Sequence, residues 1–209
     1  VEGAFSTDFF GFSCFCYNRF MLRAFIQKIV RARSELVVQR VFPYLGNSTR
    51  IIDIGSGTGD VAYLLGKRGK NITPVDVGDF HGPRLVKTII YDGKTLPFPD
   101  RSFDTALLLM VMHHTPDPKI VFSEAVRVAK EVVVIETSFT NPINKVFTVV
   151  SDAVGNLRLE AFWNSYKSDS QWRIFFKNNG FEIIESRKYN DRNFGIIPFL
   201  HILYYLRRK

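Results

Sequence analysis

Residues 51–60 read Ile51-Ile52-Asp53-Ile54-Gly55-Ser56-Gly57-Thr58-Gly59-Asp60, an apolar run that passes into a glycine-rich turn. The apolar run predicts a buried parallel strand, and the glycines allow the turn to approach a ligand closely. A helix is predicted from Asp60 to Arg68, and the free N–H groups of its first turn would face the same ligand. This stretch therefore indicates the opening strand, turn and helix of a ligand-binding α/β domain.

Strands and helices alternate along the chain on both sides of this turn. Seven strands are predicted, at 50–54, 71–77, 87–91, 105–112, 131–136, 181–186 and 200–206. Two further helices are expected, one from the Asp117-Pro118 cap to about Lys130 and one from the Ser168-Asp169-Ser170-Gln171 capping box to Asn179. The alternation favours a doubly wound, mostly parallel sheet with helices on both faces.

A length of 209 residues, of which 46% are hydrophobic, suits a single domain with a full core. Within residues 1–209 we expect a helical cap at 1–48, a ligand-binding core at 49–136, and a C-terminal helix and strands at 168–209. Residues 137–167 are too long for a plain connection and carry helical apolar spacing at 146–150. We interpret them as an inserted lid or substrate-binding element.

Acidic residues at the predicted strand ends indicate the kind of ligand. Asp53 would repel the pyrophosphate of a dinucleotide but would attract a cationic head group, and Asp60 stands where the G-x-G-x-x-G fingerprint requires glycine. These features favour S-adenosylmethionine over NAD. Asp76, at the end of the second strand, suits the two ribose hydroxyls, and Asp92, after the third strand, could accept a hydrogen bond from the adenine amino group.

Four motifs between residues 50 and 137 together resemble the class I S-adenosylmethionine-dependent methyltransferases, in the methyltransferase type 11 branch that includes ubiquinone and menaquinone biosynthesis methyltransferases. The motifs are Asp53-Ile-Gly-Ser-Gly-Thr-Gly59, Pro74-Val-Asp76-Val, Asp92-Gly-Lys-Thr-Leu-Pro-Phe-Pro-Asp-Arg-Ser-Phe-Asp104 and Val111-Met-His-His-Thr-Pro-Asp-Pro118. The resemblance implies a Rossmann-like seven-stranded sheet with an antiparallel last strand. It also implies a set of cofactor-binding residues: Asp53, Gly55, Ser56, Gly57, Thr58, Gly59, Asp76, Val77, Asp92, Gly93, Leu109 and Met110. The chain departs from the family before the fifth strand, where the usual Pro-Gly-Gly turn is missing.

The expected chemistry needs little help from the protein, because the methyl carbon of a sulfonium is already electrophilic. Holding the acceptor in line is then the main task, and a base is needed only for a protonated acceptor. His113, after the fourth strand, is the candidate general base, although a His-His pair there also fits loop packing. Candidate acceptor-binding residues are Tyr17, His114, Asn156, Arg158 and Trp163. The histidines show no zinc-type spacing, so no metal is expected.

The formal net charge of +8 is unevenly distributed along the chain. Residues 1–50 carry +4 and residues 186–209 carry +5, whereas residues 51–185 carry −1. This pattern lacks the basic stripe through the fold that is typical of nucleic-acid-binding domains. The basic stretch at 19–40 suits either a solvated helix face or peripheral contact with an anionic membrane. Two cysteines separated by a single residue indicate reduced thiols, hence a cytoplasmic protein, with the inner membrane face as a further expected site.

Three functions fit these observations. The first is methyl transfer to a small-molecule or lipid-like acceptor, which the many aromatic residues at both 9–20 and 139–166 favour. The second is an RNA or protein methyltransferase, but the Asn/Asp-Pro-Pro-aromatic motif of base-modifying enzymes is replaced here by Met110-Val-Met-His-His114. The third is a non-catalytic protein that binds S-adenosylmethionine.

Overall fold

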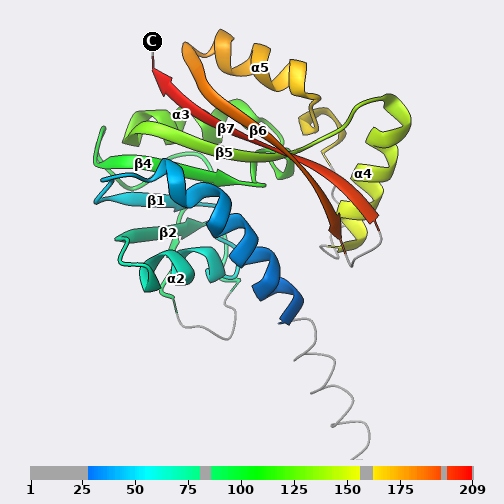
Figure 1. Ribbon diagram of the computed structural model, residues 1–209. Helices are drawn as coiled ribbons and strands as arrows, with labels where there is room; N and C mark the ends of the chain where they lie inside the picture. Colours follow the sequence, from blue (N-terminus) through cyan, green and yellow to red (C-terminus); the bar gives the residue numbers. More distant parts are fainter. Residues whose placement is uncertain (1–27, 81–85, 156–161, 194–196, 209) are drawn as a thin grey trace, which may run out of the picture.

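The computed structural model describes residues 28–80, 86–155, 162–193 and 197–208 (Figure 1). A helix at 28–41 precedes the sheet. The other helical elements are η1 (Phe42–Tyr44), α2 (Asp60–Lys67), η2 (Met112–His114), α3 (Pro118–Val128), α4 (Pro142–Gly155), η3 (Trp163–Ser165) and α5 (Asp169–Asn178). The strands are β1 (Ile51–Ile54), β2 (Ile72–Asp76), β3 (Ile89–Ile90), β4 (Phe103–Leu109), β5 (Ala129–Ser138), β6 (Phe181–Asn193) and β7 (Ile197–Arg208).

The seven strands form one sheet in the order β3-β2-β1-β4-β5-β7-β6. β1 to β5 pair in parallel, whereas β7 runs antiparallel to both β5 and β6. The predicted Rossmann-like sheet with a reversed last strand is therefore confirmed. The parallel strands end at one edge of the sheet, where α/β proteins bind their ligands, and α4 lies beyond this edge (Figure 1).

Alternating residues of the central strands supply the two faces of the sheet. Ile52 and Ile54 of β1 pack in a core with the apolar faces of α3 and α5. Ile51 lies on the opposite face, in a second core with the helix at 28–41 and α2. Because side chains alternate along a strand, Asp53 shares the face of Ile51 and is directed towards the helix at 28–41. This register brings that helix next to the acid of the glycine turn.

Several predicted boundaries differ from the structure. β4 ends at Leu109 rather than at residue 112, because Met110 adopts a left-handed φ of 59° and the chain turns into η2. The N–H groups of Val111 and Met112 donate to the Glu136 carboxylate at 3.2 and 2.7 Å, which holds this turn. β3 is only two residues long, while β6 and β7 extend well beyond their predicted ranges because they pair with each other.

Other local predictions are confirmed. Asp117 caps α3 by accepting from the Lys119 N–H, and the Ser168 capping box is complete. The helical spacing within residues 137–167 forms α4. α3 passes directly into β5, as the missing Pro-Gly-Gly turn in the sequence predicts. No helix in the described part of the chain is both long and apolar enough to cross a membrane.

Candidate functional site

The glycine turn links β1 to α2 and has the backbone conformation that its sequence requires. Gly55, Gly57 and Gly59 have φ values of 75°, 55° and 73°, a region that residues with a Cβ rarely adopt. At Gly55 there is also no room for a side chain, since a Cβ would overlap the side chain of Val111. At Gly57 nothing lies within 4 Å of such a Cβ. The turn is therefore packed against Val111 at Gly55 but has free space beside Gly57.

Asp53 lies beneath this turn with only 2% of its surface exposed. The Ser56 hydroxyl donates to the Asp53 carboxylate at 2.8 Å. Burial raises the pKa of Asp53 to about 6, the Ser56 hydrogen bond opposes the rise, and the charge of Asp76 adds to it. A bound cation would offset the free-energy cost of burying the ionised Asp53 carboxylate.

Asp76, at the end of β2, is bound to the same turn. One of its oxygens accepts the Gly57 N–H at 2.7 Å, and the other accepts the Val77 N–H at 2.7 Å. Asp53 and Asp76 therefore place two buried carboxylates around the turn at 55–59, with no basic side chain hydrogen-bonded to either among the described residues. We call Asp53, Asp76 and this turn the acidic cradle.

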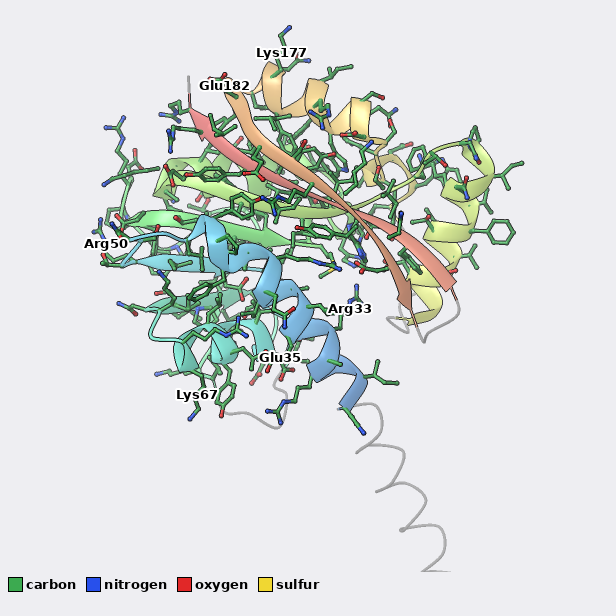
Figure 2. The ribbon with its side chains drawn as sticks, viewed as in Figure 1. Arg33, Glu35, Arg50, Lys67, Lys177 and Glu182 are labelled. Carbon is green, nitrogen blue, oxygen red and sulfur yellow. The ribbon has the colours of Figure 1, made fainter. Side chains whose placement is uncertain are left out.

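A pocket opens over Asp53 and residues 55–58 of the acidic cradle, while Gly59 and Asp76 lie outside its lining. Its lining comes from four parts of the chain: Arg33, Ser34, Asp53, Gly55, Ser56, Gly57, Thr58, Asp60, Val61, Leu109, Met110, His114 and Asp152. Arg33 projects from the helix at 28–41 on the side away from Glu35, which pairs with Arg68 at the C-terminal end of α2 (Figure 2). The Arg33 guanidinium lies 3.1 Å from the Met110 sulfur. Arg33 and Asp152 are absent from the predicted site, because only the fold brings them to it, whereas Asp60 directly follows the glycine turn in the sequence.

A second group of ionisable residues adjoins the pocket. His113 and Glu136 are both fully buried, and His113 Nδ1 lies 2.5 Å from a Glu136 oxygen. Asp152 of α4 approaches from the other side, with an oxygen 3.7 Å from His113 Nε2 and 3.5 Å from His114 Nε2. The buried Tyr166 hydroxyl donates to the same Asp152 oxygen at 2.7 Å. We call these five residues the histidine–carboxylate cluster.

This environment bears on the predicted role of His113 as a general base. Burial lowers the pKa of His113, but the two carboxylates outweigh burial and raise the pKa to about 9. An imidazole that holds its proton at neutral pH cannot accept another from a substrate. With 1% of its side chain exposed, His113 is also outside the pocket lining, whereas His114 is within it. This buried environment between two carboxylates disfavours the predicted general-base role of His113.

The remaining predicted residues fall into three groups. Val77, Asp92 and Gly93 lie beyond the pocket lining, and Asp92 is exposed and accepts the N–H groups of Lys94 and Thr95 at 2.8 Å. Trp163 is 46% exposed, with the Lys145 ammonium 4.6 Å from its ring centre. Three predicted residues lie outside the described residues: Tyr17, Asn156 and Arg158.

Two comparisons of the sequence with known proteins agree with this site. Residues 52–134 match the model of a family described as a methyltransferase domain. The ubiquinone/menaquinone biosynthesis C-methyltransferase UbiE of Rickettsia bellii is 26% identical over 196 residues, which cover 76% of this chain and 77% of that protein. The matched family segment runs from β1 into β5 and includes the whole acidic cradle.

Solved structures share the fold at low sequence identity. A SAM-dependent methyltransferase from Thermotoga maritima, described as a possible histamine N-methyltransferase, has a TM-score of 0.63 at 19% identity and covers 90% of this chain and 96% of its own. A SAM-dependent methyltransferase from Methanosarcina mazei has a TM-score of 0.63 at 18% identity, covering 80% and 96%. At these identities the likeness concerns the fold.

Proposed function

We propose that this chain, an S-adenosylmethionine-dependent methyltransferase by its domain and its fold, methylates a small, lipid-like or aromatic acceptor. The observation that carries the proposal is the acidic cradle, which opens into a pocket bounded by His114 and Asp152. The Rickettsia bellii relative is named for ubiquinone and menaquinone biosynthesis, and an acceptor of that chemical type is lipid-like and aromatic.

The residues of the cradle fit the cofactor. S-adenosylmethionine, when bound, supplies a methyl group on a positively charged sulfur. Asp53 would hold the cationic methionine end, and Asp76, whose oxygens each accept one N–H and keep a further acceptor position, would bind the ribose hydroxyls. Arg33 lines the same pocket and is the basic group suited to the methionine carboxylate. The open face of Gly57 leaves space for a ligand against the backbone.

The adenine end would lie towards β3, near Val77, Asp92 and Gly93. Asp92 already caps its own turn, but a carboxylate retains further acceptor positions for an adenine amino group. Leu109 and Met110, at the end of β4, would border the methyl group. Catalysis by this arrangement consists mainly of holding the acceptor in line and keeping water out. His113 would contribute charge to the site, not proton abstraction.

An RNA or protein acceptor is the competing class. Three carboxylates line the pocket, those of Asp53, Asp60 and Asp152, and they would repel the phosphates of a nucleic acid. The basic end segments would have to supply all of the attraction. The charge around the pocket therefore favours an uncharged small molecule.

We place the acceptor side against the inner face of a membrane, where a lipid-like substrate is found. α4 presents Ile143, Val146, Phe147 and Val150 at helical spacing, and Ile143 and Phe147 are 70% and 67% exposed. Such an apolar stripe is typical of a helix that lies in a membrane interface. Its other side carries the buried Val149 and Asp152, so α4 would connect the lipid surface to the site.

Methyl transfer is tested by incubating the chain with S-adenosylmethionine and separate quinol, phenol, sugar and lipid fractions, and following S-adenosylhomocysteine and product mass. We expect a 14 Da gain in the quinol or phenol fraction, lost in the Asp53→Asn variant. Turnover confined to the sugar fraction would contradict the proposed acceptor class.

Membrane contact is tested by cosedimentation with vesicles that contain either neutral or anionic phospholipid. We expect binding that falls when Phe147 and Ile143 are both changed to Ser, while a Ser change at the exposed Ile174 of α5 serves as the matched control. Equal sedimentation of both variants would show that α4 does not contact the membrane.

A further inference from the structure

The histidine–carboxylate cluster contains an arrangement that the proposed function does not use. Ligand atoms of His113, His114 and Asp152 all lie within 4.8 Å of one another. Two imidazoles and one carboxylate are a ligand set that first-row divalent transition metals accept. The set was not visible in the sequence, because Asp152 comes from α4 and the two histidines from η2.

The orientation of His113 is fixed as in a metal-binding histidine. Glu136 accepts the Met112 N–H at 2.7 Å and the Val111 N–H at 3.2 Å through one oxygen, so its carboxylate acts as an acceptor. Its other oxygen therefore accepts the Nδ1–H of His113, and Nε2 is the ring nitrogen directed at Asp152. A carboxylate on the far nitrogen of a histidine is the usual outer-shell support of a metal ligand.

The inward-facing Nε2 of His113 is buried and has no hydrogen-bond partner among the residues that the structure describes. Its distance to the Asp152 oxygen, 3.7 Å, is too long for a hydrogen bond. Two ligands bound at 2.0–2.2 Å to one tetrahedral metal lie about 3.4 Å apart. The His113–Asp152 and His114–Asp152 distances of 3.7 and 3.5 Å are close to that separation.

We propose that His113, His114 and Asp152 bind a divalent transition metal ion, such as Zn²⁺ or Co²⁺, through two imidazole nitrogens and one carboxylate oxygen. Mg²⁺ is disfavoured, because it prefers oxygen ligands and retains its water shell.

The site has access to the pocket. His114 and Asp152 line the pocket together with Leu109 and Met110, whereas His113 and Glu136 lie behind them. An ion bound by three protein ligands keeps open positions, here on the pocket side. An acceptor hydroxyl at such a position would lose its proton more easily, as metal-bound water does. This role on the acceptor rests on the proposed function, whereas metal binding does not.

The test uses the full chain, freed of metal by a chelator and titrated with Co²⁺ while visible absorption is recorded. We expect ligand-field bands that saturate at one Co²⁺ per chain and disappear on addition of Zn²⁺. Asp152→Asn and His114→Asn should each weaken binding by more than about 100-fold, beyond the 10–100-fold that loss of an outer-shell partner costs. His201→Asn is the matched control, since His201 also pairs with a carboxylate, Asp191, but lies outside the cluster.

Co²⁺ binding that is absent, or that survives in both the Asp152→Asn and His114→Asn proteins, would overturn the metal site. Circular dichroism of each variant separates loss of a ligand from loss of the fold. S-adenosylmethionine binding is measured by calorimetry on the chelator-treated protein. A protein that binds the cofactor but no Co²⁺ refutes the metal site alone, and one that binds Co²⁺ but transfers no methyl group refutes the proposed function alone.

Discussion

The acidic cradle and the histidine–carboxylate cluster border one pocket but are built in different ways. The cradle comes from β1, the turn at 55–59 and the end of β2, which are close in the sequence. The cluster joins η2, β5, α4 and the segment after η3, which are far apart in the sequence. In the cradle, no basic side chain among the described residues is hydrogen-bonded to the buried carboxylates, while in the cluster two carboxylates enclose a histidine. The carboxylates of the cradle are thus available to an external cation, whereas those of the cluster already face a histidine.

The largest effect is expected from substitutions that strain the backbone of the acidic cradle. Gly55→Ala must place a Cβ at a φ of 75° and against Val111, and we expect a loss of about 3 kcal/mol in the free energy of unfolding. Gly57→Ala shares the positive φ but meets no atom within 4 Å, so about 1 kcal/mol is expected. Urea denaturation of both variants measures the difference, and equal losses would refute the close approach of Val111.

The next largest effect is expected from a substitution that removes the charge of Asp53 and keeps the shape of its side chain. Asp53→Asn should weaken S-adenosylmethionine binding on the order of 100-fold, because a buried carboxylate that faces a cation is lost. Equilibrium dialysis with labelled cofactor measures the change. Asp100→Asn, an exposed acid that pairs with Arg127, is the control and should leave the affinity unchanged. Equal affinities for all three proteins would show that the cradle does not select a cation.

The pH dependence of cofactor affinity also tests whether the ionised Asp53 binds the cofactor. Because the pKa of Asp53 is raised to about 6, the carboxyl group is neutral below that pH and ionised above it. The cation binds the ionised form, so affinity should fall about tenfold per pH unit below 6 and level off above 7. Other charged groups line the pocket: Arg33, Asp60, His114 and Asp152. Calorimetry of the wild-type and Asp53→Asn proteins isolates Asp53, and a similar slope in both would contradict the assignment.

The smallest effect concerns the cluster. Tyr166→Phe removes the hydroxyl that donates to Asp152 at 2.7 Å in a buried position, and a loss of about 1–2 kcal/mol in the free energy of unfolding is expected. Cofactor affinity should not change, because Tyr166 is outside the pocket lining. Thermal denaturation and dialysis of the same protein check both statements. A large loss of cofactor affinity would show that the two regions are coupled.

The same contrast explains what could be predicted from the sequence. Asp53, the three glycines and Asp76 are close in sequence, and alternation along β1 fixes the direction of Asp53, so the cradle was predictable. Arg33, Glu136 and Asp152 reach the site only through the packing of the helix at 28–41, β5 and α4, and no local pattern marks them. The end of β4 was misplaced for the same reason, since its apolar run continues while a distant carboxylate turns the chain at Met110.

The role of His113 could not be predicted from its position after β4. Its pKa depends on Glu136 and Asp152, which belong to other elements. Asp104, at the start of β4, shows the opposite case, because its partners directly precede the neighbouring strand β1. It accepts from the N–H groups of Thr49 and Arg50 at 3.1 and 3.0 Å.

The most direct test of the proposed acceptor class follows the methyl group itself. The chain is incubated with methyl-labelled S-adenosylmethionine and a cell extract, and the label is then divided among organic-soluble small molecules, RNA and protein. We expect label in the organic-soluble fraction from the wild-type protein and none from the Asp53→Asn protein. Label in RNA or protein, or no transfer to any fraction, would contradict it.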